Sequence, residues 1–350
     1  MGPAVMPATK PQPAEIVPDE DVESVGADDS LLPQIEPIEL ALTPDVCGTR
    51  LDKVLSVLLP QYSRSRLQQW IESGYVTVDG KVVRAKAALL GDERILIRPQ
   101  LTPEDQAFQP EPIPLSIIYE DISIIVINKP AGLVVHPAAG NWSGTLLNGL
   151  LRHAPVLAGV PRAGIVHRLD KDTSGLMVVA RSLEAQTDLV RQLQARTVKR
   201  DYLALVWGTP PPSGKVDAAI GRHPRDRIKM AVSTNATAKP ALTHYRRLAS
   251  GALDGRPVSL VHCRLETGRT HQIRVHMQSI GYTLVGDTAY GKAHLAHAFA
   301  RQALHAYRLG LIHPESRQSC EWTALLPDDF ADLLVRAGIE ASIELSAETE

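Results

Sequence analysis

The first patterned stretch of the chain begins with apolar residues at helical spacing and continues with residues at strand-like spacing. A first helix is predicted by apolar residues that recur every three to four positions and end before a proline: Leu51, Val54, Leu55, Leu58, Leu59 and Pro60. Ser63 is a good N-cap for a second helix over residues 64–73. Residues 75–83 alternate around Asp79-Gly80, which predicts a β-hairpin with a type I′ turn, and residues 94–97 form a further strand.

A longer patterned region follows from about residue 117. Its strand-like runs are residues 122–128, 175–181, 202–206, 239–248, 258–265 and 303–312. Its helix-like segments are residues 144–153, 183–196, 270–280 and 328–337. Strands often follow strands, and the helices are interspersed irregularly. This order predicts an α+β fold with a mixed, largely antiparallel central sheet flanked by helices and loops.

The composition suggests boundaries around these two regions. Residues 1–47 are acidic and rich in proline, which predicts a disordered tail, and residues 339–350 predict a second acidic tail. Residues 99–114 contain five prolines and are predicted to be a linker. The expected folded domains are therefore residues 48–98 and 115–338.

Charge and cysteine content limit the class of protein. The net charge is −2, but residues 47–336 hold 36 bases and 25 acids, a net charge of +11, which is compatible with a polyanionic partner. The three cysteines, Cys47, Cys263 and Cys320, form no CxxC pair, which favours a reducing compartment. No apolar run approaches the roughly 18–20 residues that cross a bilayer, and no export signal is evident. We therefore expect a cytoplasmic protein without a membrane partner.

The most unusual stretch is residues 163–180, in which a charged loop separates two apolar runs. The loop places Asp170 beside His167, Arg168 and Lys171, an arrangement that suits nucleophilic or base chemistry. An ordinary charged loop with an Asx turn at Asp172 is the structural alternative. A calcium loop is excluded, because its twelfth position would be Arg181 instead of Glu. An aspartate-nucleophile phosphatase is disfavoured, because His167 and Arg168 interrupt the apolar strand.

The run GIVHRLDKDTSGLMVVAR over residues 164–181 resembles the catalytic motif of the RluA-type pseudouridine synthases. Four other blocks agree with that family in order and spacing: residues 127–137, 200–204, 266–276 and 302–306. Residues 221–225 and 230–232 are most similar to members that act on large-subunit ribosomal RNA. The resemblance covers roughly residues 48–338. It implies that the protein isomerises specific uridines of that RNA, 23S in bacteria, to pseudouridine without a cofactor.

The resemblance also implies roles for individual residues. Asp170 is the essential carboxylate, and whether it attacks the ribose, attacks the base or abstracts a proton stays open. Tyr202 stacks on the target base, and Arg269 is expected to be the ion-pair partner of Asp170. Arg168 would fill the space that the flipped uridine vacates, while His167 and Leu169 would shape the loop.

The helix–helix–hairpin unit over residues 48–98 resembles the S4 RNA-binding domain, which has an αL-type fold. Arg50, Lys53, Arg64 and Arg66 lie at or beside its two helix starts, where backbone N–H groups and positive side chains favour phosphate. A solvated charged face is the structural alternative.

The expected partner is large-subunit ribosomal RNA, free or in an assembling subunit, and we expect a monomer. His271, His276 and His305 lack a recognised metal-ligand pattern, so we expect no metal and treat them as fold or RNA-contact residues. A non-catalytic RNA-binding or ribosome-assembly factor on the same scaffold is the alternative function.

Overall fold

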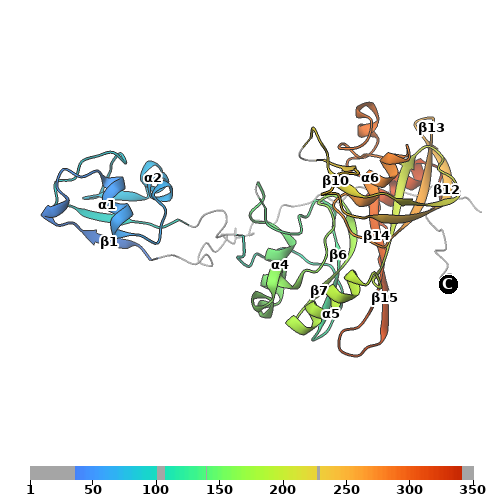
Figure 1. The fold of residues 1–350 in the computed structure, drawn as a ribbon, viewed down its shortest axis with the longest axis horizontal. Helices are drawn as coiled ribbons and strands as arrows, with labels where there is room; N and C mark the ends of the chain where they lie inside the picture. Colours follow the sequence, from blue (N-terminus) through green and yellow to red (C-terminus); the bar gives the residue numbers. More distant parts are fainter. Residues whose placement is uncertain (1–35, 101–106, 139, 227–228, 341–350) are drawn as a thin grey trace, which may run out of the picture. The chain divides into compact units, whose positions relative to one another are not determined.

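The structure, a computed structural model, describes residues 36–100, 107–138, 140–226 and 229–340. Contacts divide the chain into two compact units, residues 1–100 and 101–350, which are described separately (Figure 1). Residues 1–35 and 341–350 of the predicted tails and residues 101–106 of the predicted linker lie outside the described residues.

The first unit packs two helices against a four-stranded antiparallel sheet. The helices are α1 (Leu51–Leu58) and α2 (Arg64–Glu72), and the strands follow the order β1 (Ile38–Ala41), β4 (Arg94–Ile97), β2 (Val76–Val78) and β3 (Lys81–Val82). The apolar stripes of both helices bury Leu51, Leu55, Leu67 and Trp70 against the sheet. Asp79 and Gly80 have φ values of 46° and 75°, as the type I′ turn of the β2–β3 hairpin requires.

The predicted disorder up to residue 47 is wrong for part of that segment. β1 pairs with β4, and the short 3₁₀ helix η2 (Pro44–Val46) follows it. Ile38 and Leu40 alternate along β1 and pack against the core of the unit. Prolines lie on both sides of this strand, so its composition resembles that of a disordered segment. β1 is an edge strand, and its pairing with β4 holds it in place.

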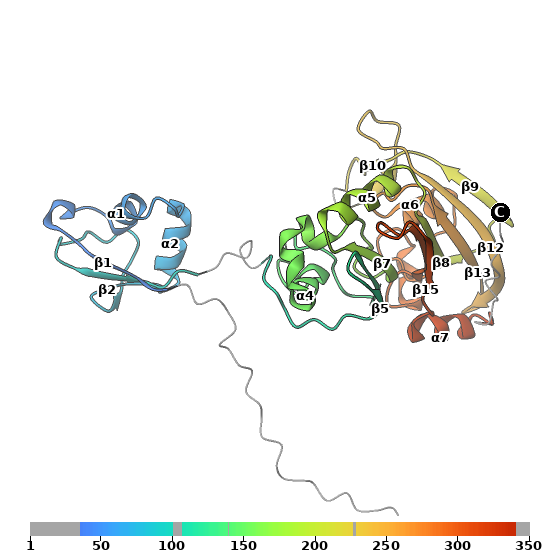
Figure 2. The same ribbon diagram turned by 90° about the horizontal axis from the view of Figure 1, so that it is seen from below.

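The second unit is built on a nine-stranded mixed sheet (Figures 1 and 2). Its order is β5 (Ile117–Glu120), β6 (Ile124–Lys129), β7 (Ser174–Ala180), β14 (Leu304–Ile312), β8 (Lys199–Trp207), β13 (Arg256–Leu265), β12 (Leu242–Leu253) and β9 (Ser213–Asp217), with β15 (Ser319–Thr323) paired to β14. β7 and β14 are parallel, whereas the other strand pairs of the described sheet are antiparallel. The predicted α+β class with a largely antiparallel sheet is confirmed.

Helices cover both faces of this sheet. α4 (Leu146–His153) and α6 (Gln272–Ser279) bury their apolar residues on the face that carries Tyr202. α5 (Leu183–Gln194) and α7 (Asp328–Arg336) pack on the opposite side, where Leu203 and Leu205 point. Side chains alternate along a strand, so Tyr202 is directed to the first face and its neighbours to the second.

Smaller elements complete the unit. They are the β10 (Ile220–Arg222) and β11 (Met230–Val232) hairpin and the 3₁₀ helices η3 (Pro155–Gly159), η4 (Pro161–Gly164) and η5 (Ala293–Ala298). No helix in the described ranges is long and apolar enough to cross a membrane.

Two predicted boundaries of the second domain need correction. Ala107 is buried, and its carbonyl and that of Gln109 accept hydrogen bonds from the Asn148 side chain of α4. Residues 107–111 therefore pack on the domain instead of linking to it. At the other end Ile339 is buried beneath α7, within the predicted tail. In both places isolated apolar residues are held by tertiary contacts that the composition does not reveal.

Candidate active site

The motif over residues 163–180 forms a loop that folds back along β7. Nε2 of His167 accepts a hydrogen bond from the backbone N–H of Val178 at 3.0 Å. Burial lowers the pKa of His167 to about 3, so the ring is neutral and able to accept this bond. Leu169 is buried in the core, and the next side chain, Asp170, turns toward a cleft. Asp170 therefore lies in the loop between the buried Leu169 and the start of β7.

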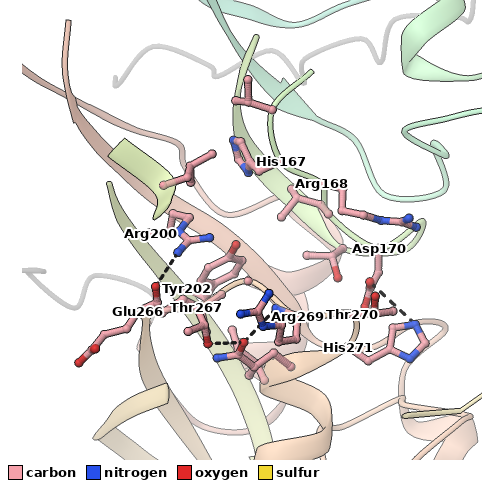
Figure 3. A pocket seen from close by; sticks show the side chains of 18 of the residues that line it. His167, Arg168, Asp170, Arg200, Tyr202, Glu266, Thr267, Arg269, Thr270 and His271 are labelled. Carbon is pink, nitrogen blue, oxygen red and sulfur yellow. Dashed lines mark hydrogen bonds and ion pairs between the residues drawn. The ribbon is translucent and has the colours of Figure 1, made fainter. Parts of the chain in front are cut away.

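The cleft has a volume of about 560 Å³ and lies between this loop, β8 and the segment that leads into α6. All the residues predicted to act in the catalytic domain line it (Figure 3): His167, Arg168, Leu169, Asp170, Tyr202 and Arg269. Segments far apart in the sequence therefore meet at one site.

The ion-pair partner of Asp170 is Arg274, which corrects the prediction of Arg269. Nη1 of Arg274 lies 3.0 Å from Oδ2 of Asp170. Arg269 instead donates from Nε to the carbonyl oxygen of Pro240 at 3.1 Å, and its backbone N–H bonds Oε1 of Gln272. Arg269 precedes α6, whereas Arg274 lies inside it and is 7% exposed. The docking of α6 on the sheet decides which arginine reaches the carboxylate.

Arg274 is itself held by a second carboxylate. Its Nε and Nη2 bind the two oxygens of Asp287 at 2.7 and 2.9 Å, and Oδ1 of Asp287 also accepts the N–H groups of Ala289 and Tyr290. Burial opposes the charge of Arg274, but Asp287 and Asp170 outweigh burial and raise its pKa. This guanidinium bridges a fully buried carboxylate and the carboxylate in the cleft.

His271 completes the surroundings of Asp170. Its Nε2 is 3.9 Å from Oδ1 of Asp170, and its Nδ1 lies 2.8 Å from the hydroxyl of Tyr290. That hydroxyl accepts the N–H of Met230, so its own proton is available to His271. Burial lowers the pKa of His271. The favoured arrangement is a neutral ring with its Nε2–H directed toward Asp170.

Tyr202 comes from the middle of β8 and is 5% exposed. Burial raises the pKa of Tyr202 to about 12, while the neighbouring Arg200 partly opposes this shift. The hydroxyl therefore keeps its proton at neutral pH and is a hydrogen-bond donor to whatever occupies the cleft.

Four side chains from elsewhere brace the four residues that follow Asp170. Nζ of Lys129 donates to the carbonyl of Lys171 at 2.9 Å, and Arg301 donates to that of Asp172 at 3.1 Å. The remaining two braces are Gln302 on the Thr173 hydroxyl and His305 on the Ser174 hydroxyl. Hydrogen bonds from other elements therefore hold the loop immediately after Asp170.

In the first unit a buried aspartate organises two of the predicted RNA contacts. Asp52 is fully buried and accepts hydrogen bonds from Arg50, Arg64 and Gln68. Burial opposes its charge, but these bonds outweigh burial and lower the pKa of Asp52. The side chains of Arg50 and Arg64 remain 43% and 52% exposed. Both guanidiniums are thus fixed while part of each faces solvent.

The other two predicted contacts differ in their surroundings. Arg66 stacks against Tyr62 and Trp70, with its guanidinium carbon 5.3 and 5.1 Å from the ring centroids, and donates to the carbonyl of Gln100. Lys53 is exposed on α1. A role of these residues in RNA binding stays a prediction.

The three histidines set aside in the sequence have different environments. His276 is fully buried between Thr243 and the carbonyl of Ala218, and His305 is fully buried beside Ser174, so both support the fold. His271 alone of the three lines the cleft. Within the described residues no three His, Cys, Asp or Glu side chains form a metal-binding group.

Sequence reasoning did not single out Arg274, Asp287, Lys129 or Arg200. A signal was present for Arg274, because a charged residue between Ile273 and Val275 in a buried helix requires a charged partner. The segment Gly286-Asp-Thr-Ala-Tyr-Gly291 showed only turn chemistry. Its link to Arg274 is a tertiary contact.

Comparison with known proteins identifies the family of each folded unit. Residues 123–279 match the family model of RNA pseudouridylate synthase, and residues 49–95 match that of the S4 domain. The ribosomal large subunit pseudouridine synthase D of Nitrosomonas europaea is 56% identical over 304 residues, which cover 85% of this chain and 87% of that protein. The protein of the same name from Neisseria meningitidis serogroup B is 49% identical over 342 residues, 95% of this chain and 88% of its own.

A solved structure extends the likeness to the fold. Human RNA Pseudouridylate Synthase Domain Containing 1 superposes with a TM-score of 0.52 at 30% identity, covering 64% of this chain and 87% of its own. Such identity along nearly the whole length of its relatives means that this chain is a pseudouridine synthase of the RluA family with an S4 domain in front.

Proposed function

We propose that this enzyme isomerises specific uridines of large-subunit ribosomal RNA to pseudouridine, with Asp170 as the essential carboxylate. One observation carries the proposal: Asp170, Tyr202 and the basic segment before α6 line a single cleft. The chain is similar along nearly its whole length to synthases named for the large ribosomal subunit, which supports that substrate.

The reaction exchanges one bond of the base for another. The bond between N1 of uracil and C1′ of the ribose breaks, the base turns, and a bond from C5 to C1′ forms. The proton on C5 is lost and N1 gains one, so atoms and charge balance without oxidation or reduction. A nucleophile or base, a proton donor and a dry pocket for the base are sufficient.

The residues of the cleft match these needs. Asp170 supplies the carboxylate, and Arg274 fixes its direction by the ion pair. Tyr202 presents a protonated hydroxyl and an aromatic face for stacking on the uracil. Arg168 makes no ion pair with another described residue, so it is available to occupy the space left by the flipped uridine.

The cleft is also suited to RNA by its charge. Six arginines and two carboxylates line it, and both carboxylates are already paired, Asp170 with Arg274 and Glu266 with Arg196. In the first unit, Arg50, Lys53, Arg64 and Arg66 would contact phosphates and contribute to site choice. The proposal includes free or assembling large-subunit RNA as substrate, a monomer, and a cytoplasmic location.

The test is to map pseudouridines in large-subunit RNA with and without this protein, by carbodiimide labelling and primer extension. Wild-type protein should create pseudouridine at defined uridines, and Asp170→Asn should bind the RNA normally without modifying it. Residual turnover of Asp170→Asn within about tenfold of wild type, a barrier change under about 1.4 kcal/mol, would remove Asp170 from the role. Tight RNA binding by the wild type without any isomerisation would favour the non-catalytic assembly factor.

A further inference from the structure

We propose that Arg200 forms a phosphate-binding site in the wall of the cleft, which holds a phosphodiester of the RNA at or beside the target uridine. Arg200 lies on β8 two residues before Tyr202 and lines the cleft. It is only 6% exposed, so its charge is removed from water even without substrate. A buried charge of this kind is costly unless a partner of opposite charge neutralises it.

Three arginines are buried among the described residues, and Arg200 differs from the other two. Arg274 binds both oxygens of Asp287, and Arg301 binds both oxygens of Asp329. Arg200 makes no ion pair with any carboxylate of the described chain. Its Nη2 donates to the backbone carbonyl of Glu266 at 3.2 Å, and its Nε is buried without a partner.

The carboxylates near Arg200 are engaged elsewhere. Glu266 offers Arg200 only its carbonyl, because its side chain binds His244 at 2.7 Å and Arg196 at 3.2 Å. Asp201 follows Arg200 in the strand, so its side chain points to the opposite face of the sheet, where Oδ1 pairs with His262 and Arg264. Asp170 is paired with Arg274. The missing negative charge must therefore come from a ligand.

The immediate surroundings of Arg200 strengthen the demand for an anion. Burial lowers the pKa of Arg200, Tyr202 partly opposes this, and the positive charge of Arg269 lowers it further. Figure 3 shows Arg200 and Arg269 close to Tyr202. A Cβ built on Gly268 would lie 2.7 Å from Nη1 of Arg200, so the chain passes the guanidinium there without a side chain. Two like charges and a buried Nε–H without a partner form a site that suits a hydrogen-bonded oxyanion.

The chemical class of the ligand follows from charge and from the cleft. Uracil and ribose are neutral and leave the guanidinium uncompensated, whereas an RNA phosphodiester supplies one negative charge and two acceptor oxygens. This step rests on the proposed function, since it takes RNA as the occupant of the cleft. A phosphate held beside Tyr202 would fix the backbone of the flipped nucleotide while its base stays free to turn.

The first experiment compares Arg200→Met and Arg200→Lys with Arg336→Met. Arg336 also donates to one backbone carbonyl, that of Ala298, but it is exposed on α7 outside the cleft. We expect Arg200→Met to weaken binding of a substrate ribosomal RNA fragment roughly tenfold or more and to lower the salt slope by about 0.7–0.9, the loss of one phosphate contact. Arg200→Lys should keep the slope with weaker binding, and Arg336→Met should change neither.

The second experiment includes the wild type and Arg200→Lys, so it can be evaluated even if the methionine variant does not fold. Each phosphate around the target uridine is replaced in turn by a neutral methylphosphonate, and affinity is measured for wild type, Arg200→Lys and Arg200→Met. At one position, the methylphosphonate should weaken RNA binding by the wild type and should not weaken binding by Arg200→Met any further. If Arg200→Met fails to fold, a smaller effect at that position in Arg200→Lys than in wild type supports the site.

Two results would overturn the inference. One is a wild-type protein that tolerates every methylphosphonate equally. The other is an Arg200→Met variant that unfolds at lower temperature but binds RNA with an unchanged salt slope, as a merely structural arginine would. Failure of the proposed function has a different outcome, because the wild type would then leave the uridines of the RNA unmodified, whether or not it binds the RNA.

Discussion

Nη1 of Arg274 lies 3.0 Å from Oδ2 of Asp170, although the two residues are far apart in the sequence. The loop after η4 contributes the carboxylate and α6 contributes the guanidinium. The guanidinium cannot rotate away, because Asp287 holds its other two nitrogens. The direction of the Asp170 carboxylate is thus set from the side of the cleft opposite its own loop.

The first prediction separates Arg274 from Arg269. Arg274→Met should lower kcat by a hundredfold or more with little change in RNA affinity, because Asp170 loses the guanidinium that fixes its direction. It should also destabilise the fold by about 3–5 kcal/mol, because Asp287 is left buried without its partner. Arg269→Met should mainly weaken RNA binding, because Arg269 bonds Pro240 and not Asp170. Single-turnover rates and equilibrium binding measure the two effects. A collapse of kcat in Arg269→Met with nearly normal turnover in Arg274→Met would show that the ion pair is not the catalytic one.

Asp287 should act as a positioning residue for Arg274. Asp287→Asn keeps the shape of the side chain but loses its charge, so Arg274 is held less firmly. We expect kcat to fall about 10- to 100-fold, a barrier increase of roughly 1.4–2.7 kcal/mol, with KM little changed. Asp201→Asn is a matched control, because Asp201 is also a fully buried carboxylate paired with an arginine, Arg264, and does not line the cleft. An equal loss in both variants would point to general destabilisation.

Lys129 should contribute to stability more than to catalysis. Its Nζ, buried at 1% residue exposure, donates to the carbonyls of Pro130, Leu133 and Lys171. Lys129→Met leaves these carbonyls without a donor, at a cost of about 1–3 kcal/mol for each buried group that finds no other partner. Thermal unfolding should shift to lower temperature by several degrees, while kcat measured well below the transition changes less than tenfold. An unchanged melting temperature would contradict this account.

The first unit should lose stability in acid through Asp52. Its folded-state pKa is lowered, so its contribution is fully present above the unfolded pKa of about 3.9 and is lost as pH falls through the folded value. Hydrogen exchange of α1 and α2 in the full chain should therefore accelerate as pH falls below about 4, after correction for intrinsic exchange. Asp52→Asn should already exchange faster at pH 7 and show a flatter pH dependence. Asp92→Asn, at an exposed position, should behave as wild type.

Lys53 offers the cleanest test of RNA binding by the first unit. Arg50→Ala or Arg64→Ala would also remove a partner of buried Asp52, so those variants change stability as well as charge. Lys53→Ala leaves that network intact and should lower the salt slope of RNA binding by about 0.7–0.9 if it contacts phosphate. Turnover at saturating RNA should be unchanged. An unchanged slope would leave Lys53 on a solvated face.

The local sequence was sufficient for most of the elements and for singling out the loop that carries Asp170. Helical periodicity and a good N-cap predicted α1 and α2, and Asp79-Gly80 predicted the turn of the β2–β3 hairpin, because these signals act within a few residues. The motif around Asp170 could be recognised in the sequence for the same reason. It places the carboxylate, the loop and the following strand within one continuous segment.

Long-range contacts decided the rest. β1 forms only because β4 offers a free edge, and residues 107–111 are ordered only because Asn148 bonds their carbonyls. The sequence predicted one of two neighbouring arginines as the partner of Asp170, but the packing of α6 against the sheet chose the other. Arg200 appears ordinary in the sequence. Its buried, uncompensated charge emerges only when β8 enters the sheet and every nearby carboxylate is bound elsewhere, because charge compensation depends on distance in space and not on order in the chain.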